Sequence, residues 1–113
     1  NFYRKQGVDF LKGRFPIWAE RTGLAPLQLK FNRATTRWGS CNSKKQINMN
    51  WKLICHASHL IDYVIVHELC HLKHMNHSEH FWNLLGSFMP EYQVYEKILD
   101  EQITVSRFLN VSN

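Results

Sequence analysis

The stretch VIVHELCHLKHMNH, residues 64–77, places four histidines and one glutamate in a largely apolar run. The spacing of its apolar residues predicts a helix over residues 57–74. At about 100° per residue, His67, Glu68 and His71 all point towards the apolar face of that helix. Because a carboxylate on a buried face is costly unless it is paired or bound to something, this pattern indicates a functional site.

Two further features of the predicted helix follow from the same pattern. Ser58 is expected to cap its N-terminus, because a serine hydroxyl accepts hydrogen bonds from the first free backbone N–H groups. Four residues are expected on the far side, away from the buried face: Asp62, Val66, Cys70 and Lys73. Cys70 would therefore face away from the site and take no part in it.

The spacing of His67 and His71 suits a shared metal ion. Four residues along a helix leave the two imidazoles about 40° apart and about 6 Å apart along the axis. Both rings can then reach one ion, and Glu68, next to the first histidine, is placed as a general base. This is the HExxH arrangement of zinc hydrolases. The alternative is a core that contains two satisfied histidines and one buried acid.

A third protein ligand is expected, since catalytic zinc sites use three such ligands and a water molecule. On a continuous helix, His77 would lie about 15 Å from His67 and about 80° away in direction. We therefore predict that the helix ends before His77 and that Ser78 caps a new one. His77 would then swing back to the metal. His74 and His80 are the competing candidates.

The three histidines and the glutamate together predict a hydrolase with one Zn²⁺ per chain. Zinc would lower the pKa of a bound water to about 7 and polarise a carbonyl or phosphoryl oxygen. Glu68 would take the proton of that water and pass it to the leaving group.

The rest of the chain predicts an α+β fold, in which a small sheet of about three strands packs on the HExxH helix between flanking helices. Further helices are expected at residues 3–22, from Ser78 and from about Glu91, and strands at 27–31, 35–41 and 46–51. The last two strands form a predicted hairpin. Pro16 is expected to kink the first helix or to start its second half, and Gly86 to end or loosen the helix that begins at Ser78.

Composition narrows the class of protein. The 113 residues fit one domain, 1–113, and the absence of an initial Met suggests the catalytic part of a longer protein. No apolar run is long enough for a membrane helix. Three cysteines without a CxxC pair predict a cytoplasmic protein. The formal charge of +5 fits either an ordinary solvated surface or binding to nucleic acid. The oligomeric state is left open.

Four segments closely resemble one known family, the YgjP-like predicted metal-dependent hydrolases: RWGSC (37–41), INMNWKLI (47–54), IDYVIVHELCHLKHMNHSEHFW (61–82) and MPEY (89–92). That family is similar to the SprT-like zinc peptidases of the zincin group. The resemblance covers roughly residues 8–95 and implies a minimal zincin-like fold. It also implies zinc on His67, His71 and His77. Glu68 would be catalytic.

Three more residues are candidates for contact with substrate or with an oxyanion. Gly39 permits close approach of a backbone, and the strand at 35–41 or at 46–51 could pair with an extended substrate. Asn48 could line the cleft or face water. Tyr92 could donate to an oxyanion near the zinc, or serve packing alone.

Three functions follow as hypotheses. The first is a zinc-dependent metallopeptidase that acts on a peptide or protein substrate. The second is a metal-dependent hydrolase of nucleotides or other phosphoanhydrides, in which the basic residues bind the substrate. The third is a non-catalytic, metal-stabilised module that binds nucleic acid, and its binding would depend strongly on salt.

Overall fold

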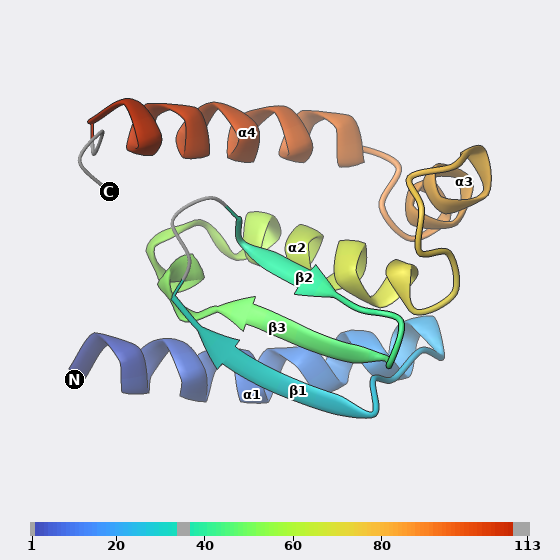
Figure 1. The fold of residues 1–113 in the computed structure, drawn as a ribbon, viewed down its shortest axis with the longest axis horizontal. Coiled ribbons are helices and arrows are strands. Elements are labelled where there is room, and N and C mark those ends of the chain that lie inside the picture. Colours follow the sequence, from blue (N-terminus) through green and yellow to red (C-terminus); the bar gives the residue numbers. More distant parts are fainter. Residues whose placement is uncertain (1, 34–36, 110–113) are drawn as a thin grey trace.

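The computed structural model describes the backbone of residues 2–33 and 37–109 and the side chains of residues 2–33 and 37–101. Figure 1 shows its helices and strands. The helices are α1 (Phe2–Thr22), η1 (Trp51–Cys55, a 3-10 helix), α2 (Ser58–His71), α3 (Glu79–Phe88) and α4 (Tyr92–Leu109), and the strands are β1 (Gln28–Asn32), β2 (Gly39–Cys41) and β3 (Gln46–Asn50). This is the predicted α+β fold class. No helix among the described residues is long and apolar enough to cross a membrane.

The sheet is small and mixed, with the strand order β1-β3-β2. β1 runs parallel to β3, with Phe31 beside Met49, and β2 runs antiparallel to β3, with Ser40 opposite Asn48. The side chain of Asn42 closes the turn between β2 and β3 by accepting two backbone hydrogen bonds. The predicted hairpin is therefore confirmed, with β2 at one edge of the sheet. Of the strand predicted at 35–41, residues 35 and 36 lie outside the described residues, and β2 begins at Gly39.

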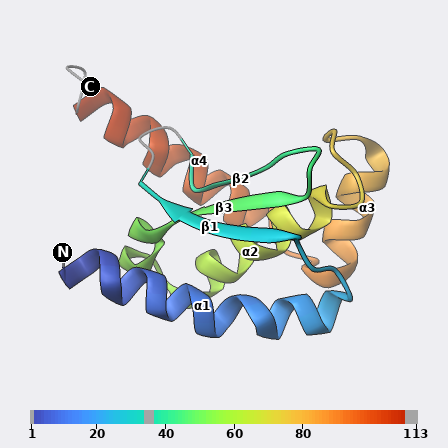
Figure 2. The ribbon, with the colours of Figure 1, turned by 60° about the horizontal axis from the view of Figure 1, so that its bottom comes forward.

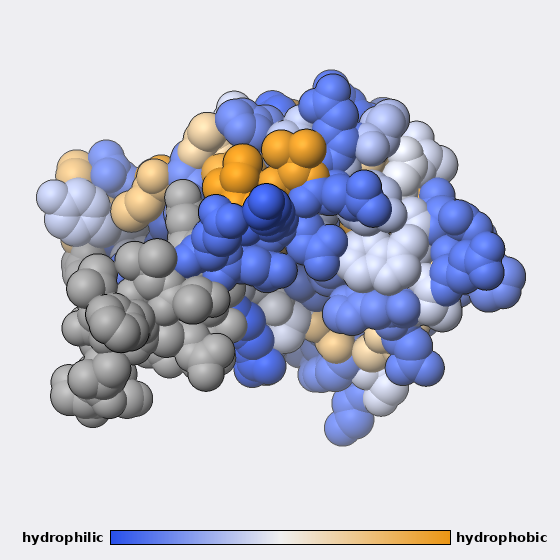
Figure 3. Space-filling model, turned by 90° about the horizontal axis from the view of Figure 1, so that it is seen from above, coloured by the Kyte–Doolittle hydropathy of each residue, from blue (hydrophilic) through white to orange (hydrophobic). Residues whose placement is uncertain are grey.

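The central element is α2, which contacts the sheet, α1, α3 and α4. Figures 1 and 2 show α1 and α2 on the same face of the sheet, while α4 runs near the edge formed by β2. Seen from the α4 side, the coloured surface is mostly hydrophilic, with an apolar cluster near its centre and smaller apolar areas around it (Figure 3). His67 and Glu68 of α2 lie on the side that faces α4 and β2.

The far side of α2 differs from the prediction. Val66 and Cys70 are fully buried and Asp62 is nearly so, because α1 packs against that side of the helix. Asp62 is accommodated there by Arg14 of α1, whose Nε and Nη2 donate to its two carboxylate oxygens at 2.6 Å. Only Lys73, just after the helix end, is exposed as expected.

Several local predictions are also corrected. Ala57, not Ser58, is the N-cap of α2, and it makes no side-chain capping hydrogen bond. α1 is continuous through Pro16, so this residue does not start a second helix, and Gly86 lies inside α3 instead of ending it. Leu27 is 81% exposed because β1 begins one residue later, so it does not share the half-buried face of the strand.

Candidate metal centre

The chain leaves its helical path between His71 and His77. α2 ends at His71, and α3 begins at Glu79, after a turn. The hydroxyl of Ser78 caps α3 by accepting from the backbone N–H of Phe81 at 3.4 Å. The predicted break and the predicted new cap are both present, so residues 64–77 do not form one straight helix.

This turn brings three imidazole rings together. The Nε2 atom of His77 lies 3.0 Å from Nε2 of His71 and 3.3 Å from Nε2 of His67. The possible ligand atoms of the three residues all lie within 4.8 Å of one another. Three nitrogen atoms facing one point make a donor set that could hold one metal ion, and imidazole nitrogen is a ligand that suits zinc.

The other ring nitrogens of two histidines have partners of their own. Nδ1 of His71 lies 3.0 Å from the backbone oxygen of His74, so it carries the hydrogen and donates to that carbonyl. Nδ1 of His67 lies 3.2 Å from the hydroxyl of Tyr63. A partner on Nδ1 fixes the ring and leaves Nε2 free to bind a metal. His74 thus contributes to the site through its backbone oxygen, which holds the ring of His71.

The surroundings favour neutral imidazoles. Burial, followed by the neighbouring His71 and His77, lowers the pKa of His67 to about 3. Burial likewise lowers the pKa of His71. Metal ligands must be unprotonated, so the environment holds these two rings in the form that binds a metal.

Aromatic residues of α3 support the rings from one side. Phe81 stacks on His71 with the ring centroids 4.4 Å apart, and Trp82 stacks on His77 at 5.4 Å. Tyr92, at the start of α4, stacks in turn on Trp82 at 5.3 Å. The position of the exposed His77 therefore depends on a stack of aromatic rings as well as on the turn.

Glu68 lies beside the histidines and is only 5% exposed. Burial raises the pKa of Glu68 to about 8, and the positive charge of Arg37 partly opposes this shift. The carboxylate packs directly on Gly39 of β2, where an added Cβ atom would lie 2.9 Å from Cγ of Glu68. The group that comes close to the backbone of β2 at Gly39 is therefore the side chain of Glu68.

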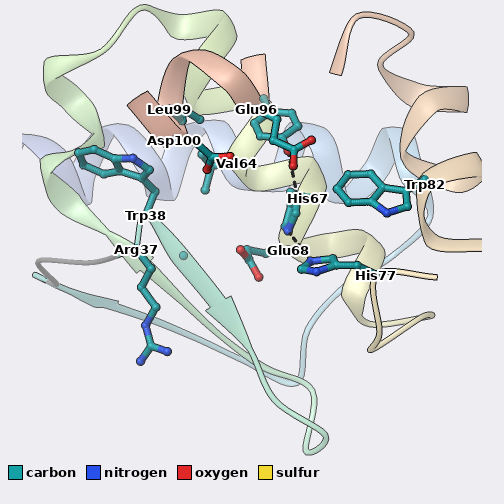
Figure 4. A pocket seen from close by; sticks show the side chains of 12 residues that line it. Arg37, Trp38, Val64, His67, Glu68, His77, Trp82, Glu96, Leu99 and Asp100 are labelled. Carbon is teal, nitrogen blue, oxygen red and sulfur yellow. Dashed lines mark hydrogen bonds between the residues drawn. The ribbon is translucent and has the colours of Figure 1, made fainter. Parts of the chain in front are cut away.

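A pocket of about 270 Å³ opens beside these side chains (Figure 4). His67 and Glu68 line it from α2, His77 from the turn, and Gly39 from β2. Its opposite wall comes from α4 and includes Glu96. The candidate metal centre is therefore open to a ligand on the side that faces β2 and α4.

The remaining predicted contacts lie elsewhere. Tyr92 does not line the pocket and packs behind Trp82. Asn48 is half-buried in the middle strand, between β1 and β2, and does not line the pocket. His74 and His80 stack on each other, with centroids 5.8 Å apart, outside the cluster of three histidines.

Some residues of the site were missed in the sequence. Tyr63 is one helical turn before His67, and that spacing was a usable signal for a partner of the ring. Glu96 and Asp100 had no such signal, because only the packing of α4 against α2 brings them to the pocket. Arg37 has no role in the sequence prediction beyond opening the segment RWGSC, and it lies just before β2 at the pocket.

Fold and site together define the class: a small α+β domain whose central helix and following turn present three histidines that could hold a metal ion, beside a buried glutamate. The family model described as YgjP-like, metallopeptidase domain, matches residues 1–102, and the chain belongs to this family. A search of curated proteins found no match. Membership confirms the family suggested by the sequence resemblance and indicates a metal-dependent hydrolase.

Proposed function

We propose that the protein is a zinc-dependent metallopeptidase with Glu68 as its general base. The observation that carries this proposal is the approach of three imidazole Nε2 atoms, separated by 3.0 and 3.3 Å, next to a glutamate that is only 5% exposed. Family membership supports the same activity.

His67, His71 and His77 would hold the zinc. The donor set fits, since all three are nitrogen ligands, and the pocket leaves one side of the cluster accessible. When bound, zinc would lower the pKa of a coordinated water to about 7 and polarise the scissile carbonyl. Three neutral ligands would leave the charge of the ion undiminished for both effects.

The chain's own groups would handle the proton. A carboxylate oxygen of Glu68 accepts a proton from the attacking water, and the same oxygen delivers it to the nitrogen of the leaving amine. Glu68 suits this role because it faces the pocket while β2 restricts its movement through the contact with Gly39. Tyr63 would hold the ring of His67 in place during the reaction.

A peptide fits the surroundings of the centre. β2 is the edge strand of the sheet, and Gly39 at its start lines the pocket, so an extended peptide could pair with this edge. Polyphosphates would meet the carboxylates of Glu96 and Asp100 on the opposite wall. Arg37, which also lines the pocket, favours the alternative of a nucleotide substrate.

The test combines metal analysis with two substrate panels. Glu68→Gln should bind about one zinc per chain and lose hydrolysis, whereas His77→Ala should lose both. His80→Ala is the matched control, because this exposed histidine lies outside the cluster. Unfolded proteins and nucleotides are assayed side by side. Full activity of Glu68→Gln on the preferred substrate contradicts the proposed base, and turnover of nucleotides alone contradicts the proposed peptidase.

A further inference from the structure

We propose that the pocket beside the candidate metal centre selects substrates with a positive charge, an ammonium or guanidinium group, which Glu96 and Asp100 of α4 bind. This inference rests on the proposed function, because it names the class of peptide that the same site accepts. We call these two residues the acidic wall.

The acidic wall faces the candidate metal centre across one pocket. Glu96 and Asp100 are four residues apart, so they lie on the same face of α4, and both line the pocket that His67 and His77 also line. Figure 4 shows them at the opposite side of the pocket from Glu68 and His77. A single substrate can therefore contact both the acidic wall and the reacting groups.

Neither carboxylate of the acidic wall has an ion-pair partner within the described part of the chain. The ion pair found there joins Arg14 to Asp62, and neither Glu96 nor Asp100 has a salt bridge or hydrogen bond. Arg37 lines the same pocket, but its guanidinium extends away from α4 (Figure 4). Burial, followed by the charge of Asp100, raises the pKa of Glu96, and His77 partly opposes this shift.

A second observation independently marks this pocket as a place for a ligand. Glu68 is more than nine-tenths buried, with 5% of its surface exposed, and makes no hydrogen bond to any described residue. Its carboxylate points into the pocket (Figure 4). Since no described protein group bonds to this carboxyl group, a polar group that enters the pocket can do so.

Two sources could supply the cation, and the chemistry of recognition is the same for both. One is the free amino terminus of a peptide, and the other is the side chain of a lysine or arginine close to the scissile bond. In both cases the cation at the acidic wall would position the carbonyl near the histidine cluster. An acidic or phosphorylated substrate would be repelled from the same wall.

The experiment compares peptides of one sequence that carry lysine, glutamine or glutamate at each position, with free or acetylated amino termini. The zinc-loaded protein should show kcat/KM about tenfold higher for a cationic peptide than for its neutral counterpart. Glu96→Gln combined with Asp100→Asn should abolish this preference, and Glu96→Lys should shift it towards glutamate. Glu101→Gln, which removes one exposed negative charge on the same helix away from the pocket, should keep it.

A binding measurement separates this inference from the proposed function. The same peptides are titrated against metal-free Glu68→Gln protein, which has no hydrolysis to complicate the readout. If no peptide is hydrolysed but cationic peptides bind about tenfold tighter, and the double substitution removes this difference, the peptidase proposal fails and the acidic wall stands. Hydrolysis without a charge preference, a preference that survives the double substitution, or equal or absent binding of all peptides overturns the acidic wall.

Discussion

Replacing Gly39 by alanine tests the contact between β2 and the proposed general base. The added Cβ would lie 2.9 Å from Cγ and 3.1 Å from Oε2 of Glu68, whereas ordinary contacts begin at 3.4 Å. Glu68 or the strand must therefore move by about 0.3–0.5 Å. Because Glu68 is buried and packed, we expect the movement to displace its carboxylate from the attacking water.

The size of the effect follows from that displacement. A misplacement of about 1 Å in a catalytic group costs roughly 100-fold, so half of that distance should lower kcat about tenfold. Overpacking a buried site costs about 1–3 kcal/mol, which would lower Tm by roughly 4–12 °C. The zinc content should stay unchanged, since the contact does not involve a histidine ring.

The assay measures kcat, zinc content and Tm of Gly39→Ala beside those of Gly13→Ala. Gly13 lies in α1, and an added Cβ there meets no atom within 4 Å. This control should keep kcat and gain about 0.5–1 kcal/mol of stability, since alanine favours a helix over glycine. If Gly39→Ala turns over substrate as fast as the wild type, the reasoning about Glu68 is refuted.

Two further predictions concern stability. Arg14→Met should destabilise the protein by about 2 kcal/mol in urea unfolding, because it leaves the carboxylate of Asp62 buried without its partner. Combining Arg14→Met with Asp62→Leu should recover most of this loss of stability. An unchanged urea midpoint in Arg14→Met would contradict this role for the ion pair. Zinc at 100 times its Kd should stabilise the folded protein by about 2.7 kcal/mol. A chelator should therefore lower the Tm of the wild type, and it should lower the Tm of His77→Ala much less. Equal chelator effects on both proteins would mean that zinc binds elsewhere.

The histidine cluster was predictable because its information is local. The period of a helix places His67 and His71 on one face, and the mismatch of His77 with that period required the turn that is observed. The cap at Ser78 marked where the chain could restart a helix. The roles of the three histidines as zinc ligands and of Glu68 as general base remain predictions, which the experiments above test.

What could not be predicted depends on packing between distant segments. The far side of α2 is buried because α1 covers it, and periodicity within one helix does not reveal its neighbours. Glu96 and Asp100 reach the pocket only through the docking of α4. For Tyr92 the sequence leaves an oxyanion donor and a packing role open, and the stacking of its ring on Trp82 favours packing.

The central claim, that three histidines share one zinc, is tested most directly by X-ray absorption at the zinc edge. We predict a shell of three imidazole nitrogens and one oxygen at about 2.0–2.1 Å for the wild type. In His77→Ala one imidazole should disappear from that shell. A sulfur ligand at about 2.3 Å, or a spectrum that His77→Ala leaves unchanged, would contradict the account.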